Sequence, residues 1–367
     1  MGMDILSTLH DMASNGDFVA IARNPLAQFG RNRRTYLGAS LLPERMVTEN
    51  AFREESIRYR TVIANAGTRY SPVQKKGANL IGAFEVILAE SDIGSEFSGR
   101  DYDALLRILA QAGGGTPSME AVAQITRWLD STVNLPLVEV LELWRWQAIV
   151  SAAVTLTGSN GYNETVSYSN PNNHRAAQTA NWSTDSTDVF EDIHTMADLL
   201  ASKGYTVNRM ITSRTVLAKM AGNDTVKSRV GVAVVNASGQ IAAAAGRATM
   251  EAINGALNAD GLPPIELYDL QYRTSTSTGY FLPRDVFVLV GTTGRDEAVD
   301  LGDSEVMVND TLGYTAVGRA VGQSMPGRHI MATPKDNKPP RIEGEGWQTA
   351  LPVITEPEAI AVINSIA

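Results

Sequence analysis

The fold class is decided by one stretch, residues 189–223, which reads VFEDIHTMADLLASKGYTVNRMITSRTVLAKMAGN. In its first half, four apolar residues recur at intervals of three and four, the spacing of a buried helix face: Val189, Ile193, Met196 and Leu200. Asp185 or Ser186 is expected to cap this helix, and Gly204 is expected to end it. The first half therefore predicts one strongly amphipathic helix.

The second half of the stretch predicts a strand that feeds a second helix. Arg209–Thr212 is the expected strand, Ser213 the helix cap, Arg214–Ala221 the helix and Gly222 its end. Ligands often bind at such turns, because the free N–H groups of the helix point outward there. Ser213, however, has no general base at any fixed offset, and helix capping explains it fully. We expect this turn to hold the chain together.

Downstream of this stretch, helices and strands follow without regular alternation. Residues 241–261 predict a helix, residues 263–272 and 280–291 predict strands, and residues 313–322 are strand-like. This irregular order favours an α+β fold over a doubly wound sheet.

The composition excludes several classes of protein. The chain has 367 residues and no cysteine, so disulfides, thiolate metal sites and thiol nucleophiles are excluded, which fits a reducing cytoplasm. The N-terminus lacks the basic start and apolar run of a secretory signal. No apolar stretch approaches the ~20 residues of a membrane span. We expect a soluble protein without a membrane partner.

Charge is distributed unevenly along the chain. The net charge is −9, but the segment from Arg31 to Lys76 holds ten basic and four acidic residues, so the remainder carries about −15. This segment is either a solvated basic stretch or an arm that meets phosphates or the acidic face of a neighbouring subunit.

Residues 56–90 predict a long two-stranded ribbon with a polar tip. Two β-prone runs flank a stretch rich in turn-forming residues. The ribbon carries five basic residues: Arg58, Arg60, Arg69, Lys75 and Lys76. An isolated two-stranded ribbon is only marginally stable in water, so we expect this ribbon to pack against another chain.

Residues 101–153 predict amphipathic helices, the last of which is a spine against which a sheet packs. Leu137, Val140, Leu141 and Trp144 form its apolar stripe, and Glu139, Glu142 and Arg145 lie off that stripe. The polar residues 155–185 follow as a long connection of the kind that tends to be functional or interfacial.

Sequence motifs give no sign of catalysis. The four histidines are far apart, and HExxH, the phosphate-binding loop, GxGxxG and GxSxG are all missing. An acidic run does not match calcium-loop spacing and is either a solvated loop or a weak divalent ion site: Asp296, Glu297, Asp300, Asp303 and Glu305. We therefore predict no catalytic residue, no metal and no cofactor.

The layout of basic arm, polar-tipped ribbon, spine helix, α+β unit and return strand resembles a known family. The chain is similar to the lambda-type major capsid proteins of tailed bacteriophages, the major capsid protein E family. The similarity is carried by residues 189–223, by the stretch FLPRDVFVLVGTTG and by the closing stretch LPVITEPEAIAVIN. The resemblance covers roughly residues 35–367. It implies the Hong Kong 97-like fold shared by tailed phages, herpesviruses and encapsulins.

The resemblance also implies a division of the chain. Residues 1–55 would be an N-terminal arm, 56–90 an extended hairpin loop, 91–180 a peripheral domain with the spine helix, 181–290 an axial domain, and 291–367 a return segment to both domains. Ser213 would then be axial-domain scaffold. We further expect the arm cluster, Arg31, Arg33 and Arg34, to face inward or across a boundary between capsomers.

The function implied is that of a head protein. Pentamers and hexamers of the chain would form an icosahedral shell around double-stranded DNA, assembled in the host cytoplasm and carried in the virion. A separate scaffolding protein, a portal and a decoration protein are the further partners that the family suggests. An encapsulin-like compartment with an enzyme cargo, or an α+β enzyme with a dispersed site, are the alternatives.

Overall fold

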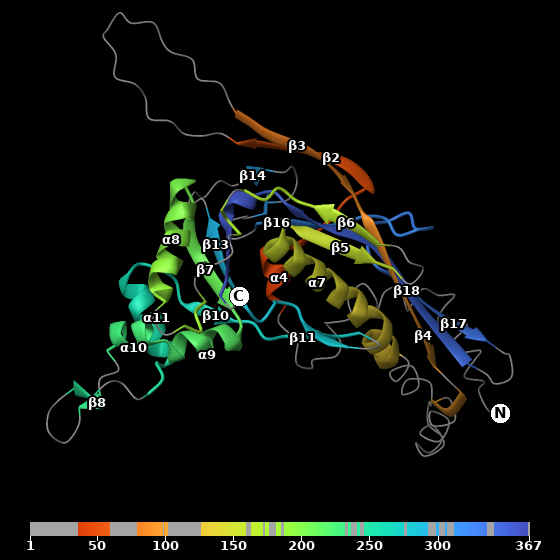
Figure 1. Cartoon of the computed structure of the whole chain (residues 1–367). Helices are drawn as coiled ribbons and strands as arrows, with labels where there is room; N and C mark the ends of the chain where they lie inside the picture. The colour runs from red at the N-terminus through yellow and green to blue at the C-terminus, as the bar shows by residue number, and fades with distance from the viewer. Residues whose placement is uncertain are drawn as a thin grey trace, which may run out of the picture.

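The computed structural model describes most of the chain outside the N-terminal region. The described residues are 36–58, 79–97, 99–101, 126–158, 163–171, 173–175, 181–184, 187–231, 234–235, 241–242, 246–274, 277–292, 299–300, 305–306, 312–335 and 341–365. Two sheets lie at the centre of this part, and a long helix, α7 (Leu135–Ser151), packs against the larger of them (Figure 1). The α+β class is confirmed.

The first sheet joins strands from the two ends of the chain. Its order is β1 (Glu44–Met46), β16 (Gly313–Val317), β18 (Arg341–Ile354) and β17 (His329–Lys335), and β4 (Ala89–Phe97) pairs with the free side of β18. Only the β1–β16 pair is parallel among these. The long strand β18 therefore connects every part of this sheet.

The second sheet has the order β10 (Ile265–Leu267), β7 (Thr206–Thr212), β13 (Val286–Thr292) and β19 (Ile360–Asn364). Its central strand β13 is buried from Val286 to Gly291, as expected for a strand covered on both faces. Four helices gather beside this sheet: α8 (Val189–Ser202), α9 (Arg214–Gly222), α10 (Asp224–Arg229) and α11 (Met250–Ala259). The apolar side chains of the second sheet join Val317, Ala350 and Ile354 of the first sheet in one core, while other apolar residues of the first sheet form a smaller cluster.

Shorter elements complete the described part. A helix, α4 (Leu37–Leu41), precedes β1, and a 3-10 turn, η2 (Pro357–Ala359), precedes β19. Four small hairpins are β5–β6 (Ala153–Thr157 and Asn163–Ser167), β8–β9 (Val234–Val235 and Ile241–Ala242), β11–β12 (Gln271–Arg273 and Thr278–Tyr280) and β14–β15 (Val299–Asp300 and Glu305–Val306). No helix in the described ranges is long and apolar enough to cross a bilayer.

The stretch 189–223 forms α8, β7 and α9 as predicted, except that β7 begins at Thr206 instead of Arg209 and that the cap of α8 differs. The predicted stripe of α8 is buried, and Gly204 follows the helix with φ +89°, a left-handed conformation that glycine adopts without strain. The cap is Asp188, whose carboxylate accepts the N–H groups of Phe190 and Glu191, so the expected caps Asp185 and Ser186 are wrong. Ser213 caps α9 as expected by accepting the Val216 N–H at 3.2 Å.

The spine helix is confirmed, although two of the three charged residues expected off its apolar stripe are buried. Helical residues 126–129 pass through a π-helical turn, η1 (Asp130–Asn134), into α7 (Leu135–Ser151). Leu137, Leu141 and Trp144 are buried as predicted. Glu142 and Arg145, expected off the buried stripe, are 0% and 1% exposed, because α7 is covered on more than one side.

Two further predictions need correction. The polar connection 155–185 contains the β5–β6 hairpin, and its His174 and Trp182 are fully buried, so part of it belongs to the core. The helix predicted over 241–261 starts only at Met250, because Thr249 caps it, while Ile241–Ala242 forms β9. In both stretches, short strands replace the expected loop or helix.

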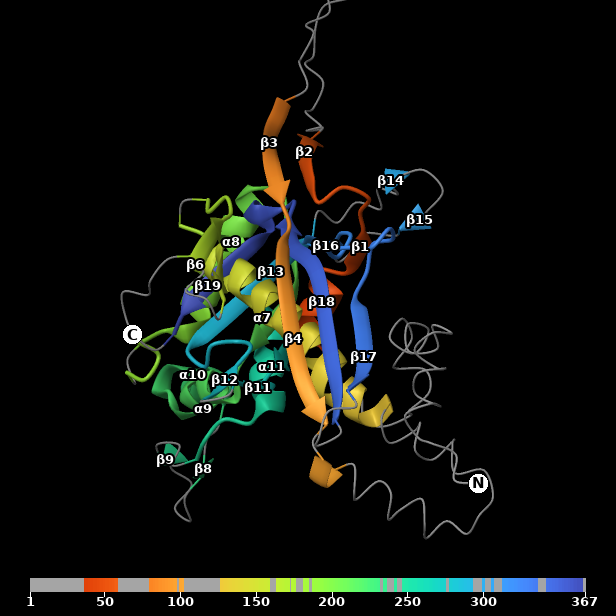
Figure 2. The same ribbon diagram turned by 90° about the vertical axis from the view of Figure 1, so that its right-hand side faces the viewer.

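The ribbon is present at its base. β2 (Ala51–Arg58) pairs antiparallel with β3 (Asn79–Ile87), and the two strands leave the body together at the top of Figure 2. The first strand begins at Ala51, so the expected start of the loop at residue 56 falls inside β2. The predicted polar tip lies outside the described residues.

Candidate functional site

The basic residues predicted from the sequence are not placed by the structure. Arg58 ends β2, but its side chain is outside the described part. The other seven lie outside the described residues altogether: Arg60, Arg69, Lys75, Lys76, Arg31, Arg33 and Arg34. Their roles stay predictions.

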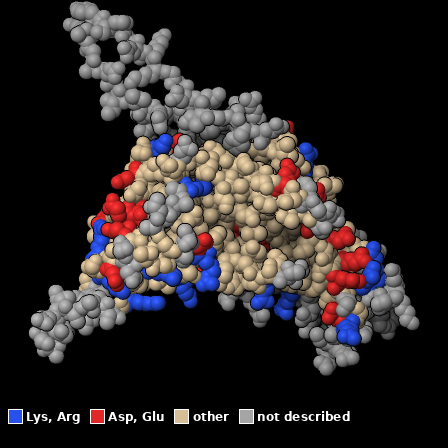
Figure 3. All heavy atoms as spheres, viewed as in Figure 1, with Lys and Arg blue, Asp and Glu red and all other residues tan. Residues whose placement is uncertain are grey.

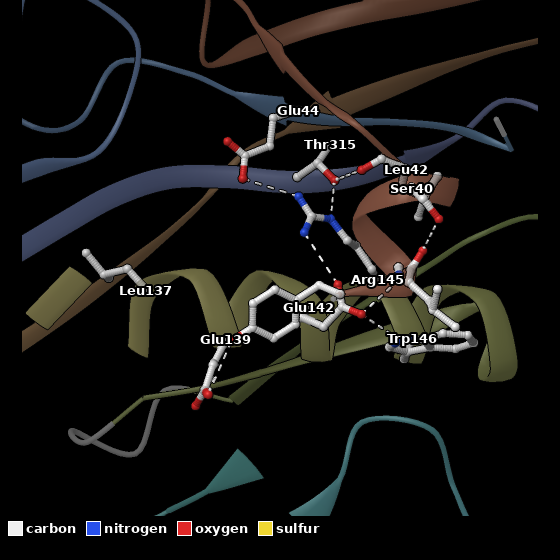
Figure 4. Close-up of polar contacts among 12 residues, drawn as sticks. Ser40, Leu42, Glu44, Leu137, Glu139, Glu142, Arg145, Trp146 and Thr315 are labelled. Carbon is white, nitrogen blue, oxygen red and sulfur yellow. Dashed lines mark hydrogen bonds and ion pairs between the residues drawn. The ribbon is translucent and has the colours of Figure 1, made fainter. Parts of the chain in front are cut away.

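The structure instead brings together a buried polar cluster on α7 that sequence reasoning missed. Its centre is the carboxylate of Glu142, which has no exposed surface (Figure 4). Oε1 of Glu142 accepts three hydrogen bonds, from Gly38 N–H at 2.8 Å, Trp146 Nε1–H at 2.8 Å and Tyr268 O–H at 2.6 Å. Three donors on this oxygen compensate for the loss of water around it, while the buried Oε2 has no hydrogen-bond donor among the described residues.

The three donors come from separate parts of the chain. Gly38 lies in α4, Trp146 is one turn further along α7, and Tyr268 follows β10 of the second sheet. Tyr268 also stacks on Trp146, with ring centroids 5.1 Å apart. Burial and then the Glu142 carboxylate raise the pKa of Tyr268 well above its usual value, so its hydroxyl stays protonated and donates.

Arg145 connects Glu142 to residues of the first sheet. Its Nη1 lies 3.6 Å from Glu142 Oε2, its Nε donates to Thr315 Oγ1 at 2.8 Å, and its Nη2 lies 3.4 Å from Glu44 Oε1. Burial lowers the pKa of Arg145, and the carboxylates of Glu142 and Glu44 oppose that shift. An arginine keeps its charge in such a setting, so the pair is an ion pair inside the protein.

The cluster ends near the surface, where Glu44 of β1 lies beside Arg328, the residue directly before β17. Arg328 forms an ion pair with Glu44 and donates from Nε to Gln348 Oε1 at 2.9 Å. Gln348 donates in turn to the Leu137 carbonyl at 2.7 Å, which returns the chain of contacts to α7. We call this set of contacts the polar chain; it runs from Gly38 and Tyr268 through Glu142, Arg145, Thr315 and Glu44 to Arg328 and Gln348.

Gly38 allows the close contact at the start of the polar chain. A Cβ added to Gly38 would lie 2.8 Å from both oxygens of Glu142, closer than carbon and oxygen can pack. The Gly38 N–H therefore reaches the carboxylate only because this residue has no side chain. This contact fixes α4, and with it the start of the described chain, against the spine helix.

A signal for this cluster was present in the sequence. Residues 137–149 carry apolar side chains on every side of the helix as well as along the predicted stripe. A helix that is apolar all round is a buried helix, and its charged residues must then be paired inside. The positions of their partners, 101 to 170 residues away, are not readable from α7 alone.

The polar chain of side-chain contacts is suited to joining the two sheets to the spine helix rather than to catalysis. Its carboxylate is enclosed and fully occupied by donors at Oε1, and no group of three metal-ligating side chains occurs among the described residues. Its members join α4, α7, the segment after β10, and strands β1, β16 and β18. The arrangement fits a role in fixing how the two sheets sit around the spine helix.

Known structures share this architecture. A candidate capsid protein from a prophage of Escherichia coli CFT073 superposes with TM-score 0.58 and 15% identity, over 97% of this chain and 99% of that chain. A phage-related protein of Bordetella bronchiseptica RB50 gives TM-score 0.53 and 15% identity, over 95% and 96% of the two chains. At this identity the similarity shows a common fold, which is the predicted capsid fold.

Sequence comparison then identifies the family. No curated protein sequence is significantly similar to the chain. The family model of phage major capsid protein E, however, matches residues 101–363, well over half of the chain. This match favours the predicted head protein over the encapsulin alternative. The chain belongs to the phage major capsid protein E family, and it is a structural component of a phage virion.

Proposed function

We propose that this chain forms the pentamers and hexamers of an icosahedral phage head that encloses double-stranded DNA, and that it catalyses no reaction. The assignments of residues 1–55 to an arm, 56–90 to an extended loop, 91–180 to a peripheral domain, 181–290 to an axial domain and 291–367 to a return segment belong to this proposal. Two separate sheets, both completed by strands after residue 291, are consistent with it.

One observation supports the proposal most strongly, the projecting ribbon. β2 and β3 pair with one another and with no other strand of the described chain. Two-stranded ribbons are marginally stable in water unless something packs on them. In a protein that assembles, a second copy supplies that surface.

Exposed apolar side chains on the first sheet, on the connection between β16 and β17 and at the base of the ribbon favour contact with other copies. Five large apolar residues are between 39% and 65% exposed: Met46, Ile87, Val321, Met325 and Met331. Met46 and Met325 line a pocket of about 340 Å³ beside Glu44 and Arg328, at the surface end of the polar chain. Apolar surface gathered in this way is typical of protein contacts.

Charge supports the choice of partner for the ribbon. The chain as a whole has a net charge of −9. One face of the body has a largely uncharged middle and carries acidic and basic side chains together on both flanks, with basic ones also along its lower edge (Figure 3). The ribbon segment 59–78 has four basic residues and no acidic one. Opposite charges would orient a basic ribbon on an acidic neighbour.

Packaged DNA, a scaffolding protein, a portal and a decoration protein are the further partners we propose, with assembly in the host cytoplasm.

Negative-stain electron microscopy of the purified full-length protein tests the proposal. The expected result is closed shells or ring-shaped capsomers, with nucleic acid as the content of particles recovered from infected cells. A monomer that stays dispersed at high concentration would contradict it. Particles filled with a tagged enzyme would favour the encapsulin alternative.

A further inference from the structure

The ribbon joins the body at one pair of residues. A single residue, Leu88, separates β3 from β4, and Asn50 directly precedes β2. The Leu88 N–H donates to the Asn50 carbonyl at 2.9 Å, next to the paired residues Ala51 and Ile87. The chain therefore passes from the ribbon into the first sheet at Asn50 and Leu88.

The side chain of Asn50 attaches this joint to the body. Asn50 Nδ2 donates to the Arg319 carbonyl at 2.9 Å, and Asn50 Oδ1 accepts the Arg319 N–H at 2.9 Å. The amide thus pairs with both backbone groups of one residue, as a neighbouring strand would. Two bonds to one residue fix an orientation that a single bond leaves free.

The segment around Arg319, to which Asn50 is hydrogen-bonded, is itself hydrogen-bonded to the first sheet. The Gly318 N–H donates to the Thr349 carbonyl of β18 at 2.8 Å, and the Gly318 carbonyl accepts the Gly327 N–H at 3.0 Å. A Cβ on Gly318 would lie 2.6 Å from Leu88 Cδ1 and closer still to Asn50 Oδ1. Gly318 therefore permits the close approach that both Asn50 bonds require.

Apolar packing holds the joint in place without setting its direction. Val86 and Leu88 are buried in a small cluster with Tyr314, Ala316, Leu351 and Val353. Burial of apolar surface is non-directional, so it allows the ribbon to tilt on this cluster. The paired bonds of Asn50 add directional side-chain contacts at this point, beside the Leu88–Asn50 backbone bond and the β4–β18 pairing that begins at Ala89.

We propose that Asn50 is a positioning residue for shell assembly, whose side-chain amide sets the angle at which the ribbon leaves the body. That angle decides whether a second copy can receive the ribbon, so the inference rests on the proposed function. Asn50 and Arg319 are exposed, and their bonds contribute little to the stability of the body. Loss of the amide should therefore change the direction of the ribbon and leave the fold intact.

Spin labels can measure the ribbon's direction, because the chain has no cysteine of its own. One label is placed at Asn79→Cys, at the far end of β3, and the other at Ala201→Cys, exposed on α8. Distances are measured by electron paramagnetic resonance in dispersed subunits of the full chain. We expect a narrow distribution with Asn50 and a broad or shifted one in Asn50→Ala.

Two variants sharpen this comparison. Asn50→Asp keeps an acceptor for the Arg319 N–H but faces the Arg319 carbonyl with a second oxygen, so it should also broaden the distribution. Asn254→Ala is the matched control, because Asn254 Oδ1 accepts one backbone N–H, that of Ile265, at 3.0 Å and lies far along the chain from the joint. This control should leave the distances unchanged.

Assembly and stability of the same variants complete the test. Asn50→Ala should give a several-fold lower yield of closed shells with an unchanged midpoint of unfolding, while Asn254→Ala assembles like the parent protein. An unchanged distance distribution in Asn50→Ala overturns the inference. So does a collapse of its unfolding midpoint, since Asn50 would then hold the body together. Failure of the parent protein to assemble counts against the proposed function alone, because the label distances still test Asn50.

Discussion

At the scale of single residues, the Glu142–Arg145 pair defines where distant segments meet. Burying an ion pair costs desolvation energy that its attraction roughly repays, so the pair adds little net stability. Removing one partner is costly, however, because the other charge is left buried. The polar chain therefore acts mainly by excluding alternative arrangements of α4, α7 and the two sheets.

Neutralising the central carboxylate should be strongly destabilising. Glu142→Gln keeps the shape of the side chain but leaves Arg145 without its most buried partner, which we expect to cost about 3–5 kcal/mol of unfolding free energy. Glu139→Gln, on the same helix and partly exposed, should cost less than about 1 kcal/mol. Denaturant unfolding of dispersed subunits measures both, and equal losses would contradict the role given to Glu142.

The close approach of Gly38 gives a second prediction. Gly38→Ala places a methyl group 2.8 Å from both carboxylate oxygens and should cost about 1–3 kcal/mol through overpacking. Gly255→Ala, in α11 with open space around the added methyl, should stabilise the protein by up to about 1 kcal/mol. The opposite signs of these two changes, measured by denaturant unfolding, distinguish a steric cause from a general effect of replacing glycine.

Sequence reasoning predicted the apolar residues of the spine helix better than its charged ones. Leu137, Leu141 and Trp144 follow the period of a buried face, and that period is local information. The burial of Glu142 depends on Gly38 and Tyr268, which lie 104 and 126 residues away. No local pattern on α7 names those partners, so the site could not be predicted as a site.

At the scale of elements, the turn that begins α9 holds neighbouring segments of the chain together, as the sequence indicated. Ser213 Oγ accepts the Val216 N–H and donates to the Arg284 carbonyl at 2.7 Å, and the residue is fully buried. Ser213→Ala should therefore cost about 1–2 kcal/mol of unfolding free energy. Ser202→Ala, which loses one exposed hydrogen bond at the end of α8, should cost only a few tenths as much unfolding free energy as Ser213→Ala. A Ser213→Ala protein as stable as the parent would contradict the capping role.

Other elements show where local signals fail. The cap of α8 was expected at Asp185 or Ser186, because several capping residues crowd together before Val189, and only the backbone turn at Asp188 decides among them. Strand β6 is polar and largely exposed, so it lacks the apolar alternation that marks a strand, whereas β5 alternates buried Val154 and Leu156 with exposed threonines. The stability of the β5–β6 hairpin comes from packing beside α7, which a single stretch of sequence does not show.

At the scale of the whole molecule, the end of the chain completes both sheets. β16, β17 and β18 build the first sheet, and β19 then pairs with β13 in the second. The order of helices and strands predicted an α+β fold, and the resemblance predicted the capsid architecture. The pairing of β1 with β16 across some 270 residues is a long-range contact that neither periodicity nor turn signals specify.

The basic arm gives a prediction at this scale. If Arg31, Arg33 and Arg34 face inward or across a capsomer boundary, changing all three to glutamine should lower the shell yield and lower the salt concentration at which shells dissociate. A control that changes Arg100, Arg127 and Arg247, which are exposed on the body, removes the same charge. Equal yield and salt tolerance for the arm variant and the parent would contradict this placement.

Hydrogen–deuterium exchange tests the central claim most directly, namely that the ribbon is stabilised by other copies of the chain. Backbone amides of residues 51–58 and 79–87 are followed in dispersed subunits and in assembled particles, with β13 as an internal reference. We predict fast exchange of the ribbon in dispersed subunits, slow exchange in particles, and slow exchange of β13 in both. A ribbon equally protected in the dispersed subunit would contradict the account.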